Sequence, residues 1–391
     1  MNEKQSPWGI LNGIRPAKIA SKLLLEGKSD GEVIDYFMKE CGTTKEKAHL
    51  VLETARCELP IRAAIEEDGI SLYIGIPFCP TRCLYCSFVT CGTRQAAKLI
   101  PEYLTCLEKE IAYCGKLVEE NHRHIETVYI GGGTPTTLSA GQLDTMLSQI
   151  ETHFDLSRCR EFTVEAGRPD TVTEEKLKVL KNHKVGRISI NPQTMNQKTL
   201  HTIGRAHTPE DIRTAMAMAR DCGFDCINMD VIAGLPGENL DQFRYTMEEV
   251  EKLSPENTTV HTMSIKRSSR LHENLEDYAL TTGDTVAQMV DFAYQYMKDL
   301  GKHPYYLYRQ KNQLGNLENV GYTKPGLESL YNIYIMEEFQ TILSLGCGGV
   351  TKTVDRKLDK IERIFNVKEP QDYIARIDEM LDRKKDVFLL G

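Results

Sequence analysis

The sequence predicts an α/β fold, in which a six-stranded partial (βα)6 barrel follows a helical N-terminal unit and precedes a mixed C-terminal domain. Between residues 71 and 265, short runs of β-branched and apolar residues alternate with longer amphipathic stretches, as in β–α units that build a parallel sheet. Before this region the patterns are helical only, and after it they are mixed. We therefore expect domains at 1–68, 69–275 and 276–391.

The N-terminal unit is expected to be a group of three short helices. They are predicted at residues 15–25, 31–39 and 45–57. Gly27 is expected to stop the first helix, Asp30 to cap the second, and Thr43 or Thr44 to start the third. Such helix pairs can bind DNA, but no candidate recognition helix here is rich in Arg. We interpret the unit as a small domain that packs against the barrel.

Six strand candidates, separated by helical stretches, make up the predicted barrel. The strands are expected at 72–76, 127–130, 161–165, 187–191, 227–232 and 259–265, and the helices between them at 96–120, 140–154, 174–183, 209–222 and 239–253. Parallel sheets of this kind carry their sites at the carboxyl ends of the strands. The residues that follow each strand are therefore the candidates for function.

Three cysteines follow the first expected strand. Cys79, Cys83 and Cys86 stand at C-x3-C-x2-C spacing, with Tyr85 just before the third. Thiolates suit zinc or an iron–sulfur cluster, and structural zinc uses four closed ligands, commonly from two cysteine pairs. No second such pair follows here. The spacing therefore favours a 4Fe–4S cluster with one iron open to a small molecule, and we expect Cys91 to be an ordinary loop cysteine.

The next strands also end in residues that can contact a ligand. After the second strand comes a glycine run at 131–133, where the backbone can approach a ligand closely; a tight turn would explain the run equally well. The third strand ends at Glu165, whose carboxylate could accept bonds from ribose hydroxyls or form a surface ion pair. Gln193, Arg205 and Asp230 lie near the ends of the fourth and fifth strands, where they could contact a ligand or simply close the barrel mouth.

Taken in order, these motifs resemble the radical S-adenosylmethionine superfamily. The ordered set resembles, within that superfamily, the oxygen-independent coproporphyrinogen dehydrogenase family and its relatives. The resemblance is carried by the segments 73–88, 131–135, 193–207 and 230–237 and covers roughly residues 70–350.

The resemblance implies a 4Fe–4S cluster held by Cys79, Cys83 and Cys86, with S-adenosylmethionine bound to the open iron, as one molecule or two. It assigns no catalytic residue beyond the cluster ligands. The positions that it implies for cofactor contacts are Tyr73, Tyr85, Phe88, Gly131, Gly132, Gly133, Thr134, Glu165, Gln193, Arg205, Asp230 and Gly234.

The resemblance also implies a tetrapyrrole substrate and a reduced electron donor protein. Oxidative decarboxylation of coproporphyrinogen III to protoporphyrinogen IX is the preferred interpretation. Two positions depart from the family: Gly75 stands where its tetrapyrrole-oxidising members typically have His, and Phe88 where they carry a fourth Cys. Relatives with Phe there include haem chaperones and tetrapyrrole methyltransferases. A methyltransferase, a haem-degrading enzyme and a non-enzymatic haem chaperone therefore remain alternatives.

A group of cations marks the candidate substrate side. Lys266, Arg267 and Arg270 follow the last expected strand, and Arg309 lies in an aromatic strip at 303–310, beside Lys311. These cations could meet the propionates of a tetrapyrrole, or they could form a solvated charge run. Because Arg can hold a carboxylate bidentately, we expect the two rim arginines to matter more than Lys266.

Beyond these residues, the C-terminal domain is expected to alternate helix and loop. A long helix is predicted at 284–300, loops at 316–322 and 346–349, and a charged helical region at 354–390. We expect this domain to cover the substrate side of the barrel.

Composition restricts the classes of partner. The chain has 391 residues, a net charge of −8 and twelve cysteines. The acidic balance argues against a nucleic-acid partner, which favours basic domains. No uncharged apolar run approaches the ~18 residues of a membrane span, and the polar first residues do not form a signal peptide. We expect a cytoplasmic protein with reduced thiols.

Overall fold

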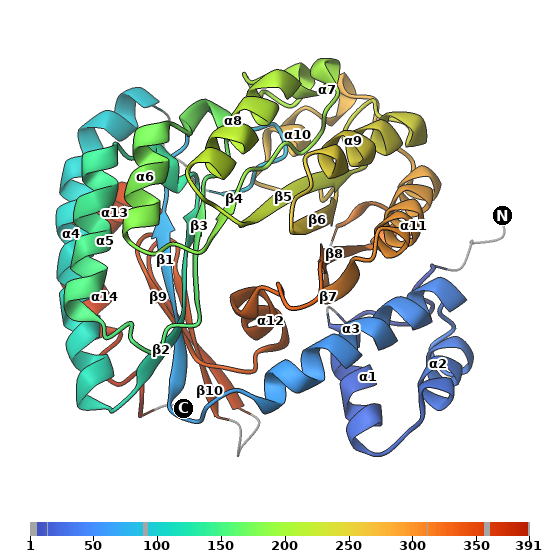
Figure 1. The fold of residues 1–391 in the computed structure, drawn as a ribbon, viewed down its shortest axis with the longest axis horizontal. Helices are drawn as coiled ribbons and strands as arrows, with labels where there is room; N and C mark the ends of the chain where they lie inside the picture. The colour runs from blue at the N-terminus through green and yellow to red at the C-terminus, as the bar shows by residue number, and fades with distance from the viewer. Residues whose placement is uncertain (1–5, 14, 89–92, 311, 356–359, 390–391) are drawn as a thin grey trace.

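One continuous sheet runs through the computed structural model, which describes residues 6–13, 15–88, 93–310, 312–355 and 360–389. The strand order in this part of the chain is β11-β10-β9-β1-β2-β3-β4-β5-β6-β8-β7. The strands β1 to β6 are mutually parallel and curve into a partial barrel with helices outside (Figure 1). Their bounds are Gly69–Ile76, His124–Gly132, Glu161–Glu165, Arg187–Ser189, Cys226–Ala233 and Asn257–Thr262. The predicted α/β partial barrel is confirmed.

Apolar residues on both faces of the strands explain why the sheet is buried. In β1 every residue except Tyr73 is buried, as expected for a strand covered by helices on one face and by the barrel interior on the other. The helices between the strands are α4 (Thr93–Glu120), α5 (Ala140–His153), α6 (Glu174–Asn182), α7 (Gln197–Thr202), α8 (Pro209–Asp221) and α9 (Leu240–Lys252). Capping boxes at Ser139, Thr208 and Asn239 start three of them. These caps fix where the loops that follow the strands end.

The N-terminal unit contains α1 (Pro16–Leu25), α2 (Asp30–Lys39) and α3 (Lys45–Ala63). The cap of α2 is Ser29 and not Asp30, because Ser29 and Glu32 form a reciprocal capping box. The helix α3 runs six residues past its predicted end at 57 and packs along β7. The buried Lys47 ammonium joins the two parts by binding Glu318 Oε1 at 2.6 Å and Asp291 Oδ1 at 2.8 Å.

The segment after residue 275 adds strands to both ends of the barrel sheet. β8 (Glu318–Thr323) pairs antiparallel with β6, and β7 (His303–Arg309) forms the edge. At the other end, β9 (Ile342–Leu345) pairs parallel with β1, and β10 (Val350–Asp355) and β11 (Lys360–Phe365) follow. The sheet thus crosses the predicted boundary at 275, and the division into domains stays a prediction.

Two predictions for this segment are wrong. The expected loop at 316–322 is mostly β8, because its polar residues find partners: Glu318 binds Lys47, and Asn319 Oδ1 accepts from Thr262 N at 2.7 Å. The expected helical region at 354–390 begins with the β10–β11 hairpin, and only its last part is helical. The remaining helices are α10 (Arg270–Glu273), α11 (Gly283–Asp299), α12 (Leu330–Glu337), α13 (Pro370–Ala375) and α14 (Ile377–Asp382), with single 3-10 turns at Pro135–Thr137, Pro169–Thr171, Leu275–Asp277 and Leu314–Asn316.

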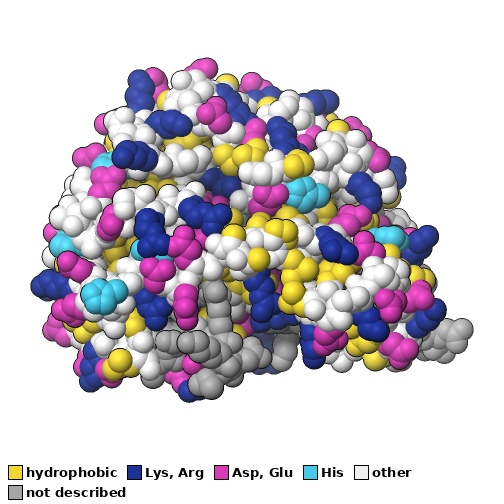
Figure 2. Space-filling model, turned by 60° about the horizontal axis from the view of Figure 1, so that its bottom comes forward, with side chains coloured by type: hydrophobic (Ala, Val, Ile, Leu, Met, Phe, Trp, Pro, Cys, Tyr) yellow, Lys and Arg dark blue, Asp and Glu magenta, His cyan; other side chains and the backbone are white. Residues whose placement is uncertain are grey.

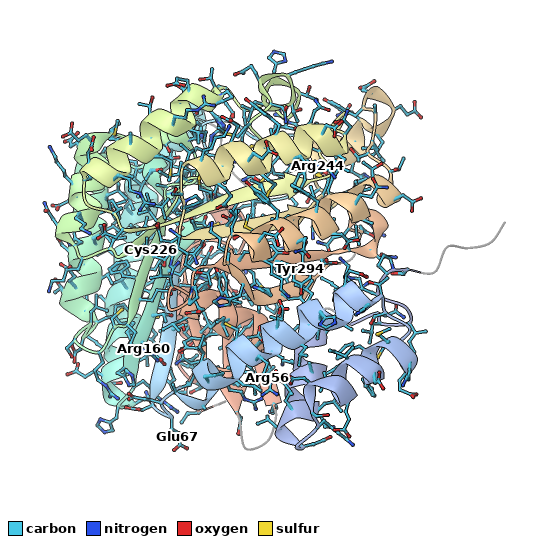
Figure 3. All side chains as sticks on the ribbon, turned by 45° about the vertical axis from the view of Figure 1, so that its right-hand side comes forward. Arg56, Glu67, Arg160, Cys226, Arg244 and Tyr294 are labelled. Atoms are coloured by element: carbon cyan, nitrogen blue, oxygen red, sulfur yellow. The ribbon has the colours of Figure 1, made fainter. Side chains whose placement is uncertain are left out.

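The helices α12 and α11 lie on opposite sides of the sheet. Figure 1 shows α12 in the space that the curved sheet encloses, where it contacts β2 and β7. On the outside, α11 packs against α9; Figure 3 labels Arg244 on α9 and Tyr294 on α11, and the Arg244 guanidinium covers the Phe292 ring at 5.0 Å. α12 therefore belongs to the barrel interior, whereas α11 belongs to the outer helical layer.

The surface carries charges of both signs. On the face in Figure 2, Lys and Arg side chains are interspersed with Asp and Glu. Among the described residues, no helix is both long and apolar enough to cross a membrane.

Candidate functional site

A cavity of about 680 Å³ lies where the carboxyl ends of the parallel strands meet. The loops after β1, β2, β3, β4 and β6 contribute to its wall, together with residues of β5 itself. Cys79, Cys83 and Cys86 all line it. The rule that placed the site at these strand ends therefore leads to one cavity that contains the three thiols.

The cysteine loop is held in place by neighbouring strand ends. Leu84 N donates to Ile203 O at 3.0 Å, and the Cys79 Sγ lies 3.4 Å from Thr134 Oγ1. The Arg168 guanidinium, which is 3% exposed, donates to both Thr81 O (3.1 Å) and Thr81 Oγ1 (2.8 Å) and lies 4.0 Å from Cys83 Sγ. Burial raises the pKa of the Cys79 thiol to about 11. A metal that binds here must therefore displace the thiol protons, and the adjacent arginine favours the resulting thiolates.

The glycine segment packs directly on this loop. Gly133 N donates to Ile76 O at 2.8 Å and Thr134 N to Phe78 O at 2.8 Å. At Gly132 φ is +107°, and a Cβ there would lie 3.2 Å from the Ile76 backbone. A side chain would be both strained and crowded at this position. Gly132, Gly133 and Thr134 line the cavity, whereas Gly131 lies behind them, against the Glu165 carboxyl.

Two acidic side chains face the cavity from β3 and β5. The Tyr129 hydroxyl donates to Glu165 Oε1 at 2.6 Å, but burial and the nearby Asp230 raise the pKa of the Glu165 carboxyl to about 7. Asp230 accepts from Asn228 Nδ2 at 2.7 Å and lies 3.7 Å from His261 Nε2. Its pKa is lowered because hydrogen bonds and the charge of His261 outweigh its burial. The two carboxyls thus differ in how well the protein itself stabilises their charge.

Gln193 and Arg205 reach the cavity with hydrogen-bonding groups to spare. Gln193 has φ of +65°, and its buried Oε1 has no hydrogen-bond partner among the described residues. The Arg205 Nη1 donates to Asn191 O at 2.6 Å, while its buried Nε has no partner there. Buried polar groups are normally paired, so these two atoms fit a site that is completed by a ligand.

Comparison with known proteins agrees with this geometry. The family model of the radical SAM superfamily matches residues 73–250. The oxygen-independent coproporphyrinogen-III oxidase-like protein HemZ of Bacillus subtilis is 44% identical over 383 residues, which cover 96% of this chain and 76% of that protein. The chain belongs to the radical SAM superfamily, in its coproporphyrinogen oxidase-like family.

Other relatives in this family carry different names. The heme chaperone HemW of Bacillus subtilis is 31% identical over 73% of each chain. The solved structure of the radical SAM enzyme coproporphyrinogen III oxidase (HemN) of Escherichia coli has a TM-score of 0.63 at 22% identity, covering 84% of this chain and 73% of that one. Radical SAM proteins use a 4Fe–4S cluster and S-adenosylmethionine, and the three thiols, the crowded glycine segment and the unpaired polar atoms fit that pair of cofactors.

Sequence reasoning missed part of this radical SAM site. Tyr129 and Tyr331 line the cavity together with Tyr73, and the Tyr129 and Tyr331 rings stack with centroids 4.4 Å apart. Tyr129 could have been found, because it precedes Gly131 by two residues and so shares its face of the strand. Tyr331 could not, because it comes from α12, whose insertion into the barrel leaves no local signal. Arg168 and His261 were missed too.

The predicted substrate cations are only partly at the cavity. Lys266 lines it and donates to Gln310 Oε1 at 2.7 Å, whereas Arg267 and Arg270 are exposed and stand outside the wall. The prediction that Arg309 meets the substrate is wrong, because Arg309 does not line the cavity. Its guanidinium donates to Leu11 O at 2.6 Å and Asn316 O at 2.9 Å and covers the Trp8 ring, so it holds the N-terminal segment in place.

The cavity wall also contains an unpredicted lysine and two of the predicted aromatic residues, but not the last predicted glycine. Lys352 of β10, which no pattern indicated, lines the cavity. Gly234 does not, because it packs against Val286, whose Cγ2 a Cβ would approach to 2.8 Å. Tyr85 and Phe88 are both in the wall, and Phe88 is 61% exposed at the mouth. Cys91 and Lys311 lie outside the described residues.

Proposed function

We propose that this radical SAM protein acts on a tetrapyrrole, and that its reaction is the oxidative decarboxylation of coproporphyrinogen III to protoporphyrinogen IX. One observation carries the proposal: the cavity that contains the three thiols is also walled by stacked tyrosines and by lysines. Aromatic faces suit a flat macrocycle, and cations suit its carboxylates. The names of the HemZ and HemN relatives support the same substrate class.

The cofactor side of the cavity would be built from the strand ends. Cys79, Cys83 and Cys86 would hold the cluster, and the backbone at Gly132 and the Glu165 carboxylate would bind S-adenosylmethionine. When bound, these cofactors supply the one-electron chemistry that removes a hydrogen atom from the substrate. The protein's own contribution is to position the propionate and to exclude water.

The substrate side would be built from tyrosines and lysines. The Tyr73, Tyr129 and Tyr331 rings are nearly parallel in each pair, with interplanar angles of 16–20°. Burial lowers the pKa of Lys266 and of Lys352, so a carboxylate beside either would stabilise its ammonium form. In the proposed reaction, two propionates become vinyl groups, and each loses CO2, one hydrogen atom and one electron to an acceptor.

A second candidate function is a haem chaperone that does not turn over. Gly75 favours it, because a Cβ there would lie 2.9 Å from Cys347 O. The turn after β9 therefore leaves no room for the His that tetrapyrrole-oxidising members typically have. Phe88 and the 31% identity to HemW point the same way.

An anaerobic assay separates the two. Reconstituted protein is incubated with S-adenosylmethionine, a reductant and coproporphyrinogen III, and a parallel sample receives haem; products are analysed by mass spectrometry. Loss of two CO2 from coproporphyrinogen with cleavage of S-adenosylmethionine supports the oxidase. Stoichiometric haem binding without substrate loss supports the chaperone. Detection of a modified haem or a methylated tetrapyrrole would contradict both proposals and indicate a different reaction on a tetrapyrrole.

A further inference from the structure

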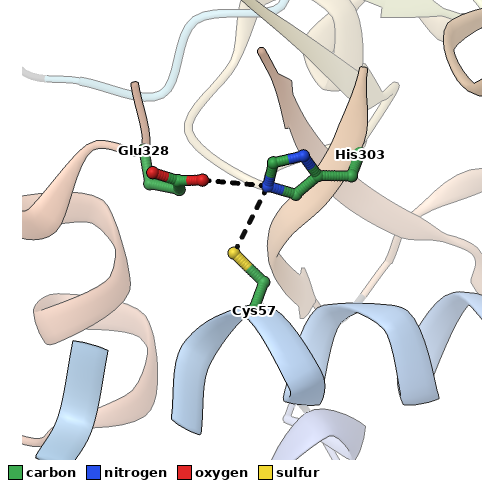
Figure 4. A group of neighbouring side chains, drawn as sticks. All are labelled: Cys57, His303 and Glu328. Carbon is green, nitrogen blue, oxygen red and sulfur yellow. Dashed lines mark hydrogen bonds and ion pairs between the residues drawn. The ribbon is translucent and has the colours of Figure 1, made fainter. Parts of the chain in front are cut away.

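Cys57, His303 and Glu328 meet at the end of the barrel opposite the cysteine loop (Figure 4). Cys57 projects from α3, His303 begins β7, and Glu328 lies between β8 and α12. The His303 Nε2 is 3.5 Å from Cys57 Sγ and 3.0 Å from Glu328 Oε1. Three elements that are distant in sequence thus bring three different metal-binding side chains to one point.

A single hydrogen bond from His303 can pair only two of these three side chains. The His303 Nε2 can carry only one proton. If it is protonated it donates to the Glu328 carboxylate, and then it cannot accept from the Cys57 thiol. If it is not, it accepts from the thiol but faces the carboxylate with two lone pairs opposed. With the proton on Nε2, His303 and Glu328 are paired and the Cys57 sulfur lies 3.5 Å from the nitrogen without a strong hydrogen bond to it, whereas a cation between the three atoms would bind all of them.

The sulfur–nitrogen spacing matches a tetrahedral ion, and the nitrogen and oxygen would have to move about 0.4 Å further apart. Zinc binds Cys sulfur at about 2.3 Å and His nitrogen and carboxylate oxygen at about 2.0–2.2 Å, which places sulfur and nitrogen about 3.6 Å apart and nitrogen and oxygen about 3.4 Å apart. The observed separations are 3.5 and 3.0 Å, and all three ligand atoms lie within 4.8 Å of one another. A thiolate and a carboxylate would also neutralise a divalent charge in this partly buried position.

The surroundings leave space beside the group and place it between separate parts of the fold. Glu328, one of the three side chains, borders a second cavity of about 960 Å³, which leaves room beside it for a fourth, water ligand. The backbone beside it is already fixed, because Arg187 Nη2 donates to Leu327 O at 3.1 Å and Glu328 O at 3.2 Å. An ion here would join the N-terminal unit to the edge of the sheet and to the segment that leads into α12.

We propose that Cys57, His303 and Glu328 bind a zinc ion that joins α3 to the barrel, separate from the iron–sulfur site. With three protein ligands and one position left for water, the site is of the open kind and differs from closed four-ligand structural zinc. The mixture of one thiolate, one imidazole and one carboxylate suits zinc better than magnesium or calcium, which prefer oxygen ligands alone.

Metal analysis of the untagged full-length protein tests the proposal. The holoprotein is loaded with iron, incubated with Zn²⁺, freed of unbound metal and analysed for both elements. We expect about one zinc per chain in addition to the cluster iron. Cys57→Ser and His303→Gln should lose this zinc. Loss of a residue that only supports a metal ligand weakens metal affinity about 10–100-fold, and loss of the ligand itself should weaken it further. Cys222→Ser, which removes a partly buried thiol at the end of α8, should keep it.

A second measurement excludes a mere loss of folding. In the Cys79→Ala/Cys83→Ala/Cys86→Ala variant, Co²⁺ should give a thiolate-to-metal charge-transfer band in the near ultraviolet, and the further change Cys57→Ser should abolish it while the circular dichroism stays the same. Zinc should also raise the Tm of the triple alanine variant, which is the parent here, but not of the same variant with Cys57→Ser added. No zinc in the parent, or equal zinc in the parent and in Cys57→Ser, would overturn the proposal and leave the group as a hydrogen-bonded contact only.

Discussion

Glu161 and Glu165 begin and end the same strand, β3, and their side chains share one face of it. Glu161, at the amino end, is buried and accepts from Ser329 Oγ (2.9 Å), Leu330 N (2.7 Å) and Tyr331 N (3.3 Å). It therefore caps the first turn of α12 with a negative charge, where a helix favours one. Glu165, at the carboxyl end, accepts one side-chain hydrogen bond, from Tyr129, and its pKa is raised to about 7.

The difference shows how the barrel divides its polar groups. At the amino end of β3 the charge of Glu161 is paired within the protein, and these contacts hold the start of α12 in place. At the carboxyl end, Gln193 and Arg205 each have a buried atom without a partner among the described residues, and the Glu165 carboxyl faces the cavity with a raised pKa. Identical side chains thus serve folding at one end and ligand binding at the other, and substitutions at the two ends should separate these roles.

The largest effect should come from the cysteine loop. Cys79→Ala/Cys83→Ala/Cys86→Ala should reduce iron from about four per chain to none after anaerobic reconstitution. The midpoint of denaturant unfolding of the iron-free protein should change little, because these side chains line a cavity. Cys347→Ala is the matched control, since Cys347 lies beside Gly75 of β1 but outside the cavity wall, and it should retain the iron. Iron in the triple variant would show that the cluster is held elsewhere.

At the opposite end, Glu161→Ala should lower the free energy of unfolding by about 3 kcal/mol, because buried backbone and hydroxyl donors of α12 lose a charged acceptor. Chemical denaturation of the iron-free protein measures this change. Iron content and affinity for S-adenosylmethionine should be unaffected. If unfolding were unchanged, the capping of α12 would contribute nothing to stability.

The raised pKa of Glu165 predicts a dependence of stability on pH. Between its ordinary value of 4.5 and about 7, the folded state binds a proton that the unfolded state releases, so this carboxyl costs stability as the pH rises through 7. In the ligand-free protein, Glu165→Gln should therefore be more stable than the wild type at pH 8, by up to about 3 kcal/mol. The gain should vanish below pH 4.5, and a gain independent of pH would contradict the prediction.

Glu165 should also contribute to the affinity for S-adenosylmethionine. Glu165→Ala is expected to weaken S-adenosylmethionine binding by about 1.5–3 kcal/mol, or one to two decades in Kd, because hydrogen bonds to a charged group are lost. Equilibrium binding to the reconstituted protein measures this. Wild-type affinity should rise as the pH is raised through 7, as the carboxylate forms. An unchanged Kd in the variant would mean that Glu165 only closes the wall.

The smallest effect concerns the substrate. Lys266→Ala and Lys352→Ala should each weaken coproporphyrin binding by about 1 kcal/mol. Arg267→Ala and Arg270→Ala should not, which reverses the order expected from the sequence, because both side chains are exposed outside the cavity. The comparison needs all four variants at equal iron content. Equal binding by all of them would remove the electrostatic argument for the substrate.

The features that sequence reasoning predicted are those with local causes. Strand, loop and helix follow each other within a few residues, so the spacing of Cys79, Cys83 and Cys86 and the glycine run could be recognised in place. The barrel and its site-bearing edge followed from that repetition.

What could not be predicted depends on contacts between distant residues. Glu318 and Asn319 resemble loop residues until Lys47 and Thr262 pair with them. In the sequence Arg309 resembles a substrate cation, and only the fold shows that its guanidinium contacts Leu11 and Trp8. Lys352 reaches the cavity only because β10 follows β9, which lies beside β1.

That last pairing has a consequence for protein synthesis. β1, which delivers the chain to the cysteine loop, has β9 on its other side, with Leu72 opposite Leu343. When the ribosome has made β1, its partner on that side is still some 270 residues away, and an open strand edge is a template for aggregation. Non-local pairing of this kind also slows folding. Chaperone protection during translation, and iron delivery only after the chain has been released, would suit a protein whose first strand is completed by one of its last.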